Sequence, residues 1–256
     1  MKKFILKTFV FSLLGLTLLV SVNYWGDGAK IFHSDYEDKI AKIILNNQNA
    51  TNISNYDERV LQKKLVNKLK INPDVLILGS SRTMLINSTY FNDKKVINNS
   101  VSGASIEDLI AIFQMYNTKK ILPKKIILGI DPWIFNENNG QIRWQSLKKE
   151  YYSFINNKSG NEESILNNKS KQLFSLSYFQ ASYKNLPNVI LQKSDPIATE
   201  EIYNQGVTKL VDASLSYGKE YREITNEEIN NNAKNYISGS IYSIENFKKI
   251  SPNIFK

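Results

Sequence analysis

Three short segments carry residues that could perform chemistry on an ester. Ser81 follows the apolar run 75–78, and a serine hydroxyl presented at such a point can attack a carbonyl carbon. Gly103 stands just before a predicted helix, where a glycine can adopt positive φ and direct backbone N–H groups at a developing negative charge. Asp131 follows a third apolar run. The segments would thus bring a serine hydroxyl, backbone N–H groups and a carboxylate to the ends of neighbouring apolar runs.

The elements that must position these residues are strands of a parallel sheet. The apolar runs 75–78, 96–97 and 126–130 are short and do not alternate, which is typical of strands buried on both faces. A helix is predicted from Ser105, which is followed by Asp108 in a capping-box pattern. Strand, strand, helix, strand is the order of a doubly wound α/β sheet, in which ligands lie at the carboxyl ends of the strands.

The same segments resemble the SGNH (GDSL-like) hydrolases. Residues 79–81 read Gly-Ser-Ser where the family has Gly-Asp-Ser, and residues 98–103 read Asn-Asn-Ser-Val-Ser-Gly where it has a turn like Asn-x-Gly-x-Ser-Gly. The resemblance covers about residues 73–135. It implies a serine esterase or acyltransferase with Ser81 as the nucleophile and the Gly103 amide as an oxyanion donor. It also places Ser80 and Arg82 at the site.

The third block of the family usually reads Gly-x-Asn-Asp, and here residues 129–132 read Gly-Ile-Asp-Pro. Asp131 therefore stands where the resemblance expects an amide donor, and an ionised carboxylate cannot donate a hydrogen bond. Three interpretations remain open. Asp131 is protonated, or it orients Arg82, or the donor is the later Asn136.

The family's last block, Asp-x-x-His, does not occur in the 256 residues. The single histidine is His33, just beyond the apolar N-terminal segment, and its simplest interpretation is a solvated juxtamembrane residue. Losing the histidine of a serine hydrolase lowers turnover by roughly 10⁶. The resemblance thus predicts that the chain as given is nearly inactive. The alternative is a non-catalytic binding or scaffold subunit of the cell envelope.

The N-terminus predicts a membrane anchor. Lysines occur at positions 2, 3 and 7, and the next charge is Asp27, so an uncharged apolar stretch separates them. At about 1.5 Å per residue this stretch just spans a hydrocarbon core of about 30 Å. Tyr24 and Trp25 suit a membrane interface better than a signal-peptidase site, which favours an uncleaved anchor over a cleaved signal peptide. The lysines place the N-terminus in the cytoplasm and the remaining chain outside.

Composition limits the partners. The chain has no cysteine, so it can form neither disulfides nor a thiolate metal site, and we predict no cofactor and no metal. Its net charge of +9 comes from lysines scattered among acidic residues and asparagines, which argues against nucleic-acid binding. A positive surface facing anionic envelope polymers or lipid headgroups is the simpler interpretation. The expected partners are the membrane, through residues 8–25, and an acylated polysaccharide as substrate.

These features divide the chain into parts. We predict a cytoplasmic tail (1–7), a transmembrane signal anchor (8–25), a stem with a first helix (26–72) and an SGNH-like domain (73–256) with a helical insertion around 133–187. The fold class is α/β, a three-layer, flavodoxin-like parallel sheet, truncated at the C-terminus because residues 226–256 contain no buried strand. A helix is also predicted at 36–45, and weaker strands are predicted at 189–191 and 207–211. Another helix is predicted to carry Leu61, Leu65 and Leu69 on one face. A capping pair of Ser54 and Asp57 precedes this helix, and Pro73 stops it.

Several residues have a simple structural interpretation beside the functional one. Ser81 alone could be a helix N-cap. Four aromatic residues could stack on sugar rings, although such residues more often belong to a core: Trp133, Trp144, Tyr151 and Tyr152. Asp212 and its neighbours are expected to form a surface turn.

Overall fold

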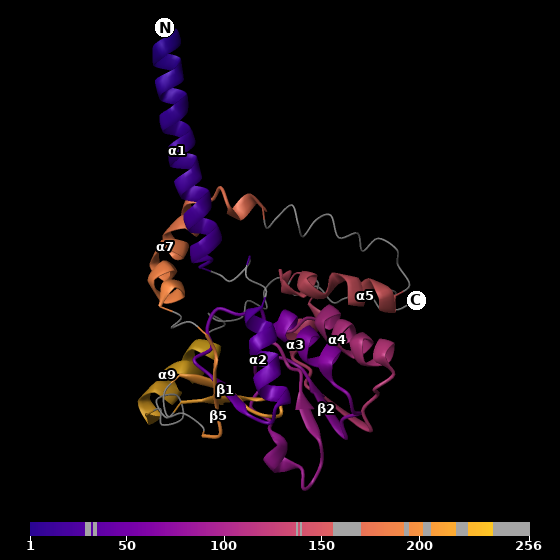
Figure 1. The fold of residues 1–256 in the computed structure, drawn as a ribbon. Helices are drawn as coiled ribbons and strands as arrows, with labels where there is room; N and C mark the ends of the chain where they lie inside the picture. Colours follow the sequence, from indigo (N-terminus) through magenta and orange to yellow (C-terminus); the bar gives the residue numbers. More distant parts are fainter. Residues whose placement is uncertain are drawn as a thin grey trace.

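The computed structural model describes residues 1–28, 32, 35–136, 138, 140–155, 170–191, 195–201, 206–218 and 225–237. In these residues the chain forms a long apolar N-terminal helix, a three-stranded parallel sheet with helices packed on it, and a four-stranded antiparallel sheet (Figure 1). The protein is therefore a mixed α/β protein.

The helices are α1 (Lys2–Gly26), α2 (Tyr36–Leu45), α3 (Glu58–Lys68), α4 (Ile106–Lys119), α5 (Lys148–Phe154), α7 (Leu176–Ile190) and α9 (Asn226–Ile237), with short 3₁₀ turns η1 (Ser88–Tyr90), η2 (Pro132–Phe135) and η3 (Arg143–Leu147). The strands are β1 (Asn49–Thr51), β2 (Val75–Leu78), β3 (Val96–Asn98), β4 (Lys125–Leu128), β5 (Ile197–Thr199), β6 (Val207–Lys209) and β7 (Leu215–Tyr217).

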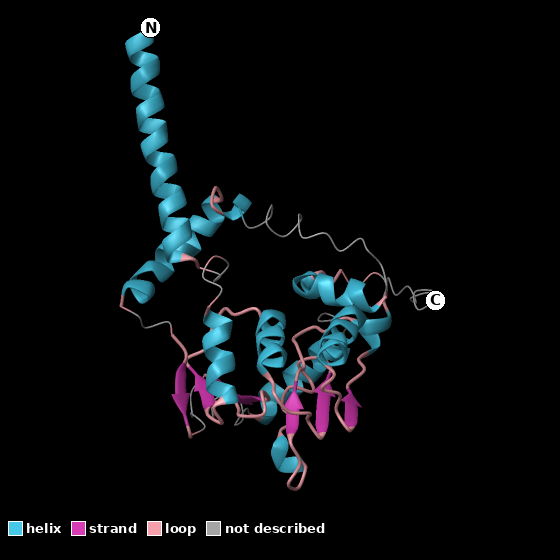
Figure 2. Cartoon of the chain, turned by 45° about the vertical axis from the view of Figure 1, so that its right-hand side comes forward, coloured by secondary structure: helices cyan, strands magenta, loops and turns pink. Residues whose placement is uncertain are grey.

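The parallel sheet has the order β3-β2-β4, so the first of its strands in the sequence lies in the centre (Figure 2). Val75 is opposite Val96 on one side and Lys125 on the other. All four residues of β2 are buried, as expected for a central strand of a parallel sheet. The predictions of strands at 75–78 and 96–97 are confirmed, and the strand predicted at 126–130 occupies 125–128.

Helices α3 and α4 enclose the main core with β2. The Asp57 carboxylate accepts hydrogen bonds from the N–H groups of Arg59 (2.9 Å) and Val60 (3.1 Å). Asp57 is therefore the N-cap of α3, and the prediction that Ser54 caps this helix is wrong. Ser105 is the N-cap of α4 as predicted, and its N–H donates to the Asp108 carboxylate (2.9 Å).

The antiparallel sheet, with the order β5-β1-β6-β7, was not predicted. Each of its strands has only three residues, and most are polar or small, so no hydrophobic alternation marks them. The strand predicted at 207–211 is confirmed over 207–209. The strand predicted at 189–191 is wrong, because α7 extends to Ile190, and a three-residue apolar run cannot distinguish a strand from one turn of a helix.

A buried lysine lies in the antiparallel sheet. Lys209 is 1% exposed, and its ammonium group donates to the Ala213 carbonyl (3.0 Å). Burial lowers the pKa of Lys209 to about 8, although the nearby carboxylates of Glu58 and Asp212 raise it. Keeping this group charged at neutral pH therefore costs the folded protein desolvation free energy.

We expect Lys209→Met to change the pH dependence of stability. Between pH 8 and pH 10.5 the unfolded chain binds the Lys209 proton more tightly than the folded one, so the free energy of unfolding of the wild type rises with pH. The Met variant lacks this contribution. Denaturant titrations should show the variant more stable at pH 7 by up to about 3 kcal/mol, with the difference vanishing near pH 10.5. If the free energies of unfolding of the two proteins changed with pH in the same way, the assignment of a buried charge to Lys209 would be contradicted.

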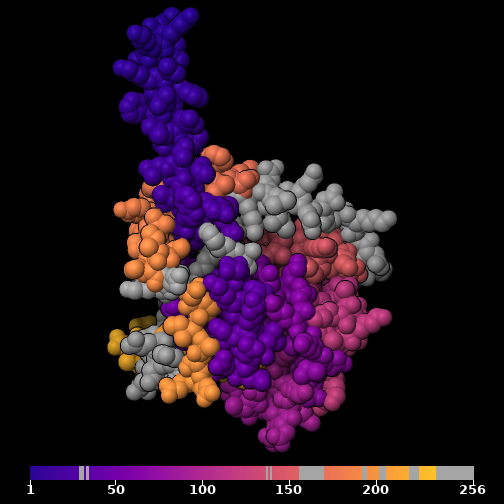
Figure 3. All heavy atoms as spheres, in the orientation of Figure 1, coloured from indigo at the N-terminus to yellow at the C-terminus, as the bar shows by residue number. Residues whose placement is uncertain are grey.

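Helix α1 projects from the rest of the molecule, and α7 packs against its C-terminal part (Figure 3). In the described residues, α1 is the one helix long and apolar enough to cross a membrane, and its apolar window is not buried. The Asn23 carboxamide nitrogen lies 2.8 to 3.2 Å from the carbonyl oxygens of Gln172, Leu173 and Ser175. Specific hydrogen bonds therefore hold the C-terminal part of α1 against α7 and the residues just before it.

Asp27 and two small residues complete the α1–α7 contact. The Tyr178 hydroxyl donates to the Asp27 carboxylate (2.6 Å), and the Asn185 carboxamide donates to the Gly26 carbonyl (2.8 Å). A Cβ atom on Gly26 would overlap the backbone of Ser182, so only glycine allows this close approach.

Candidate functional site

The three segments singled out in the sequence meet at the carboxyl ends of the parallel strands. The Gly129 N–H donates to the Leu78 carbonyl (2.7 Å), and the Val101 N–H donates to the Gly79 carbonyl (3.0 Å). The segments that follow β3 and β4 are therefore hydrogen-bonded to the end of β2. This edge of the sheet is where open α/β proteins bind their ligands.

Ser80 and Ser81 lie in a turn that follows β2, and their side chains have opposite environments. Ser80 is fully buried, and its hydroxyl accepts from the Arg82 N–H (3.3 Å). Ser81 is exposed. Residues 81–85 form a turn and not a helix, so the interpretation of Ser81 as a helix N-cap is wrong. The turn presents the Ser81 hydroxyl to solvent at the end of the central strand.

Thr83 holds this turn against the two neighbouring segments. Its hydroxyl donates to the Ser80 carbonyl (2.9 Å) and lies 2.8 Å from the Ser100 hydroxyl. A Cβ atom on Gly79 or on Gly129 would overlap the Thr83 side chain. Because Gly79 and Gly129 have no Cβ atom, the turn that carries Thr83 can pack closely against the ends of β2 and β4.

Gly103 adopts φ +54°, the left-handed conformation that the sequence predicted for this position. A Cβ atom on Gly103 would lie 2.6 Å from the Arg143 Nη2 atom and 2.8 Å from the Gln141 Nε2 atom. The Gln141 side-chain oxygen accepts from Arg143 Nε (3.0 Å), which orients the guanidinium group. A cation thus lies directly beside the backbone expected to hold an oxyanion.

Sequence reasoning missed Arg143 and Gln141. They lie about forty residues after Gly103, in a segment with no family motif and no regular pattern. Only the fold brings them to the strand edge, where η3 packs near α3 and α4.

The turn that carries Gly103 is hydrogen-bonded to side chains in the first turn of α3. The Arg59 guanidinium makes two hydrogen bonds of 2.7 Å to the Asp108 carboxylate and a third to the Ser102 carbonyl (3.2 Å). The Glu58 carboxylate accepts from the Ser102 hydroxyl (2.9 Å) and from its N–H. Both charged side chains of the Arg59–Asp108 pair are buried, at 3% and 0% exposed.

Asp131 lies beside Arg82. Its carboxylate is 3.4 Å from Arg82 Nη1, and the same guanidinium lies 5.0 Å from the centre of the Trp133 ring. Of the three interpretations of Asp131, the structure matches the one in which it orients Arg82. The side-chain oxygen of Asn136 accepts from the Asn138 N–H (3.1 Å), and the role of its amide nitrogen as a donor stays a prediction.

The site therefore combines a solvent-facing hydroxyl with two guanidinium groups, one beside Gly103 and one held by Asp131. Such a set can bind and stabilise negative charge on an oxygen atom. No histidine occurs in the described ranges, because His33 falls in the gap at 33–34. Nor does the described part of the chain hold a cluster of three or more residues that could bind a metal ion.

Two simple interpretations from the sequence have different outcomes. Trp144 lies 5.2 Å from Tyr151 and 6.3 Å from Tyr152, ring centre to ring centre, and all three pack on the core around α4. The core interpretation therefore holds for these aromatic residues. The predicted turn at Asp212 is present, but its expected surface position is wrong, because Asp212 is buried and its carboxylate accepts from the Ser88 and Ser214 N–H groups.

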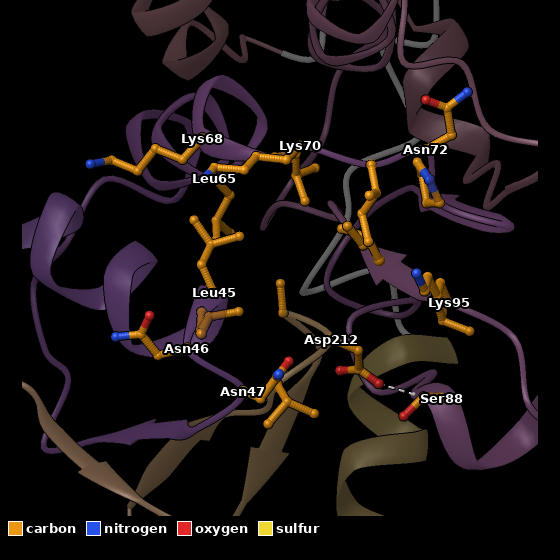
Figure 4. Close-up of a pocket in the computed structure, with 18 of the residues that line it drawn as sticks. Leu45, Asn46, Asn47, Leu65, Lys68, Lys70, Asn72, Ser88, Lys95 and Asp212 are labelled. Carbon is orange, nitrogen blue, oxygen red and sulfur yellow. Dashed lines mark hydrogen bonds between the residues drawn. The ribbon is translucent and has the colours of Figure 1, made fainter.

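A hollow lies at the opposite, amino-terminal edge of the parallel sheet. It has a volume of about 660 Å³ and is bordered by the ends of α2 and α3, the loop before β3 and the turn at Asp212 (Figure 4). Lys70 and Lys95 line it together with aliphatic side chains and the Asp212 carboxylate, whereas the ammonium group of Lys68 pairs with Asp38 (3.0 Å). This hollow suits an anionic ligand with an apolar part.

Comparison with protein-family models, with curated proteins and with solved structures finds no match to the chain.

Proposed function

We propose that the chain is a membrane-anchored, SGNH-like serine esterase or acyltransferase domain that acts on an O-acylated carbohydrate of the cell envelope. In this proposal α1 spans the membrane with the N-terminus in the cytoplasm, and the α/β domain lies outside. The Ser81 oxygen attacks the ester carbonyl and loses its proton to solvent water, since no histidine occurs among the described residues. The backbone near Gly103 and the Arg143 guanidinium stabilise the resulting oxyanion, which collapses to an acyl-serine as the carbohydrate alcohol leaves and takes up a proton from water. Without the Asp-x-x-His base we expect turnover to be very slow.

One observation carries the proposal. The exposed Ser81 turn is hydrogen-bonded, through the backbone of β2, to the segment that presents Gly103 in the left-handed conformation with a cation beside it. The positive site also suits a substrate that develops negative charge, because the guanidinium groups are in place before the reaction.

Covalent labelling tests the proposal. The full chain, in lipid nanodiscs, should react slowly at Ser81 with an excess of an alkyl fluorophosphonate over hours, because no histidine base activates the hydroxyl, and Ser81→Ala should lower this slow labelling at least tenfold. Ser177→Ala removes an exposed serine at the start of α7 and should leave labelling unchanged. Mass spectrometry locates the adduct. Labelling that is equal in wild type and Ser81→Ala would refute the assignment of the nucleophile.

The second candidate is a non-catalytic binding or scaffold subunit of the envelope. The lysine-walled hollow at the amino-terminal edge favours it, because this hollow lies away from Ser81 and could bind an anionic envelope polymer independently. A full chain that binds an anionic polymer in a salt-dependent manner, and that shows no adduct on Ser81, would select this candidate.

A further inference from the structure

The hollow at the amino-terminal edge of the parallel sheet leaves aliphatic surface open to solvent (Figure 4). Ile71, in the segment before β2, and Val211, in the turn after β6, both line it and are 52% and 43% exposed. Leu45 and Leu69 line it from the ends of α2 and α3. Its volume of about 660 Å³ is typical of small-molecule sites. A ligand that covers this surface therefore gains free energy from the hydrophobic effect.

Three lysines give the same hollow a positive charge. Lys70, Lys94 and Lys95 line it, and all three are exposed. None of the three forms an ion pair with a described residue, although other lysines on this side of the protein do. Cations that no carboxylate neutralises attract a negatively charged group.

The carboxylates around the hollow are paired with those other lysines. Asp38 contacts the ammonium groups of Lys42 and Lys68, both at 3.0 Å. Asp74, at the start of the central strand, pairs with Lys124 (2.7 Å). These carboxylates therefore leave the charge of the three lining lysines in excess.

The remaining negative groups at the hollow are satisfied by hydrogen bonds. The C-terminal end of α3 has exposed carbonyl dipoles, which repel an anion. Here the Lys119 ammonium group donates to the carbonyls of Val66 (3.0 Å), Asn67 (2.7 Å) and Leu69 (2.8 Å), so a cation compensates this helix end. The Asp212 carboxylate accepts from two backbone N–H groups.

We propose that this hollow binds a single-chain anionic lipid. Its carboxylate or phosphate head group lies among Lys70, Lys94 and Lys95, and its acyl chain covers Ile71 and Val211. A neutral lipid would leave the lysines without a partner, and a polyanion with no apolar part would leave the aliphatic surface in water. The site lies at the opposite edge of the sheet from the proposed nucleophile, so it goes beyond the proposed esterase activity and is independent of it.

Photocrosslinking tests the site in the full chain held in phosphatidylcholine nanodiscs. The probe is decanoic acid with a diazirine at its chain end, and mass spectrometry should locate its adducts on the peptides that line the hollow, such as the one containing Val211. Excess decyl phosphate should lower these adducts roughly tenfold or more, because it has the same chain and an anionic head group. Decanol lacks the charge and acetate lacks the chain, so neither should compete well at the same concentration.

Matched variants separate charge recognition from general apolar binding. Lys70→Gln/Lys95→Gln should lower the adduct yield roughly tenfold at a subsaturating probe concentration. Lys120→Gln/Lys125→Gln removes the same charge from two exposed lysines that do not line the hollow and should match the wild type. Partitioning of the probe into the nanodisc is the same for all variants, so their adduct yields can be compared directly.

Several results would overturn the proposal. Absence of adducts in the hollow excludes a lipid there, whatever else fills it. Equal competition by decanol identifies a general apolar site, and competition by an acidic peptide as strong as that by decyl phosphate identifies a peptide site. Equal adduct yields in the two double variants would show that Lys70 and Lys95 do not hold the head group. None of these results bears on the labelling of Ser81.

Discussion

Replacing Arg59 by Met should lower the free energy of unfolding by about 3 to 5 kcal/mol. The substitution leaves the buried Asp108 carboxylate without its two charge-assisted hydrogen bonds, and an uncompensated buried charge is among the most destabilising changes in a protein. It also frees the Ser102 carbonyl in the turn before Gly103. Denaturant titration followed by tryptophan fluorescence measures the loss.

Two further variants identify the cause of that loss. Lys63→Met on the same helix breaks a partly exposed pair with Glu150 and should cost about 1 kcal/mol or less. The double variant Arg59→Met/Asp108→Leu removes both buried charges and should recover a large part of the stability. A double variant as unstable as Arg59→Met alone would show that packing, and not charge burial, dominates at this position.

Replacing Asn23 by Leu should open the α1–α7 contact. The three carbonyl oxygens of residues 172–175 lose their shared donor, which should cost about 2 to 4 kcal/mol in this contact. Leucine keeps the apolar character of α1, so membrane insertion should be unaffected. Hydrogen exchange of the α7 amides should become roughly 100-fold faster, as the opening free energy falls by that amount.

The control for this change is Thr17→Leu. Thr17 lies on α1 before the contact with α7, and its hydroxyl bonds only to the Leu13 carbonyl within the helix. Exchange in α7 should match the wild type in this variant. Unchanged α7 exchange in Asn23→Leu would mean that other contacts, such as that of Tyr178 with Asp27, hold the pair together.

The sequence predicts correctly those elements that are determined by a local pattern of residues. The wholly apolar run of β2, the Ser105 cap of α4 and the uncharged run of α1 each have one physical cause, and all three elements form where expected. The antiparallel sheet was missed because its central strand β1 pairs with segments more than a hundred residues away, as Asn49 with Thr199, and the hairpin of β6 and β7 has only three residues in each strand. Such pairing leaves no local pattern.

The site was predictable to the same degree. Ser81 and Gly103 lie at strand ends, where a turn residue and a glycine are visible in the sequence. Arg143 was not predictable, because its place beside Gly103 depends on how η3 packs. The burial of Asp212 was missed for a similar reason, since its partner Ser88 belongs to a loop far away in sequence.

Three segments of the chain join the α1–α7 pair to the rest of the protein. They lead from α1 to α2, from α5 to α7 and from α7 to β5, and Asp195 just before β5 also binds Lys39 of α2 (3.0 Å). A single connection would let the α/β part rotate freely about α1, whereas three connections restrict that rotation. If α1 lies in a lipid bilayer, the α/β part therefore has a limited range of orientations relative to the axis of α1.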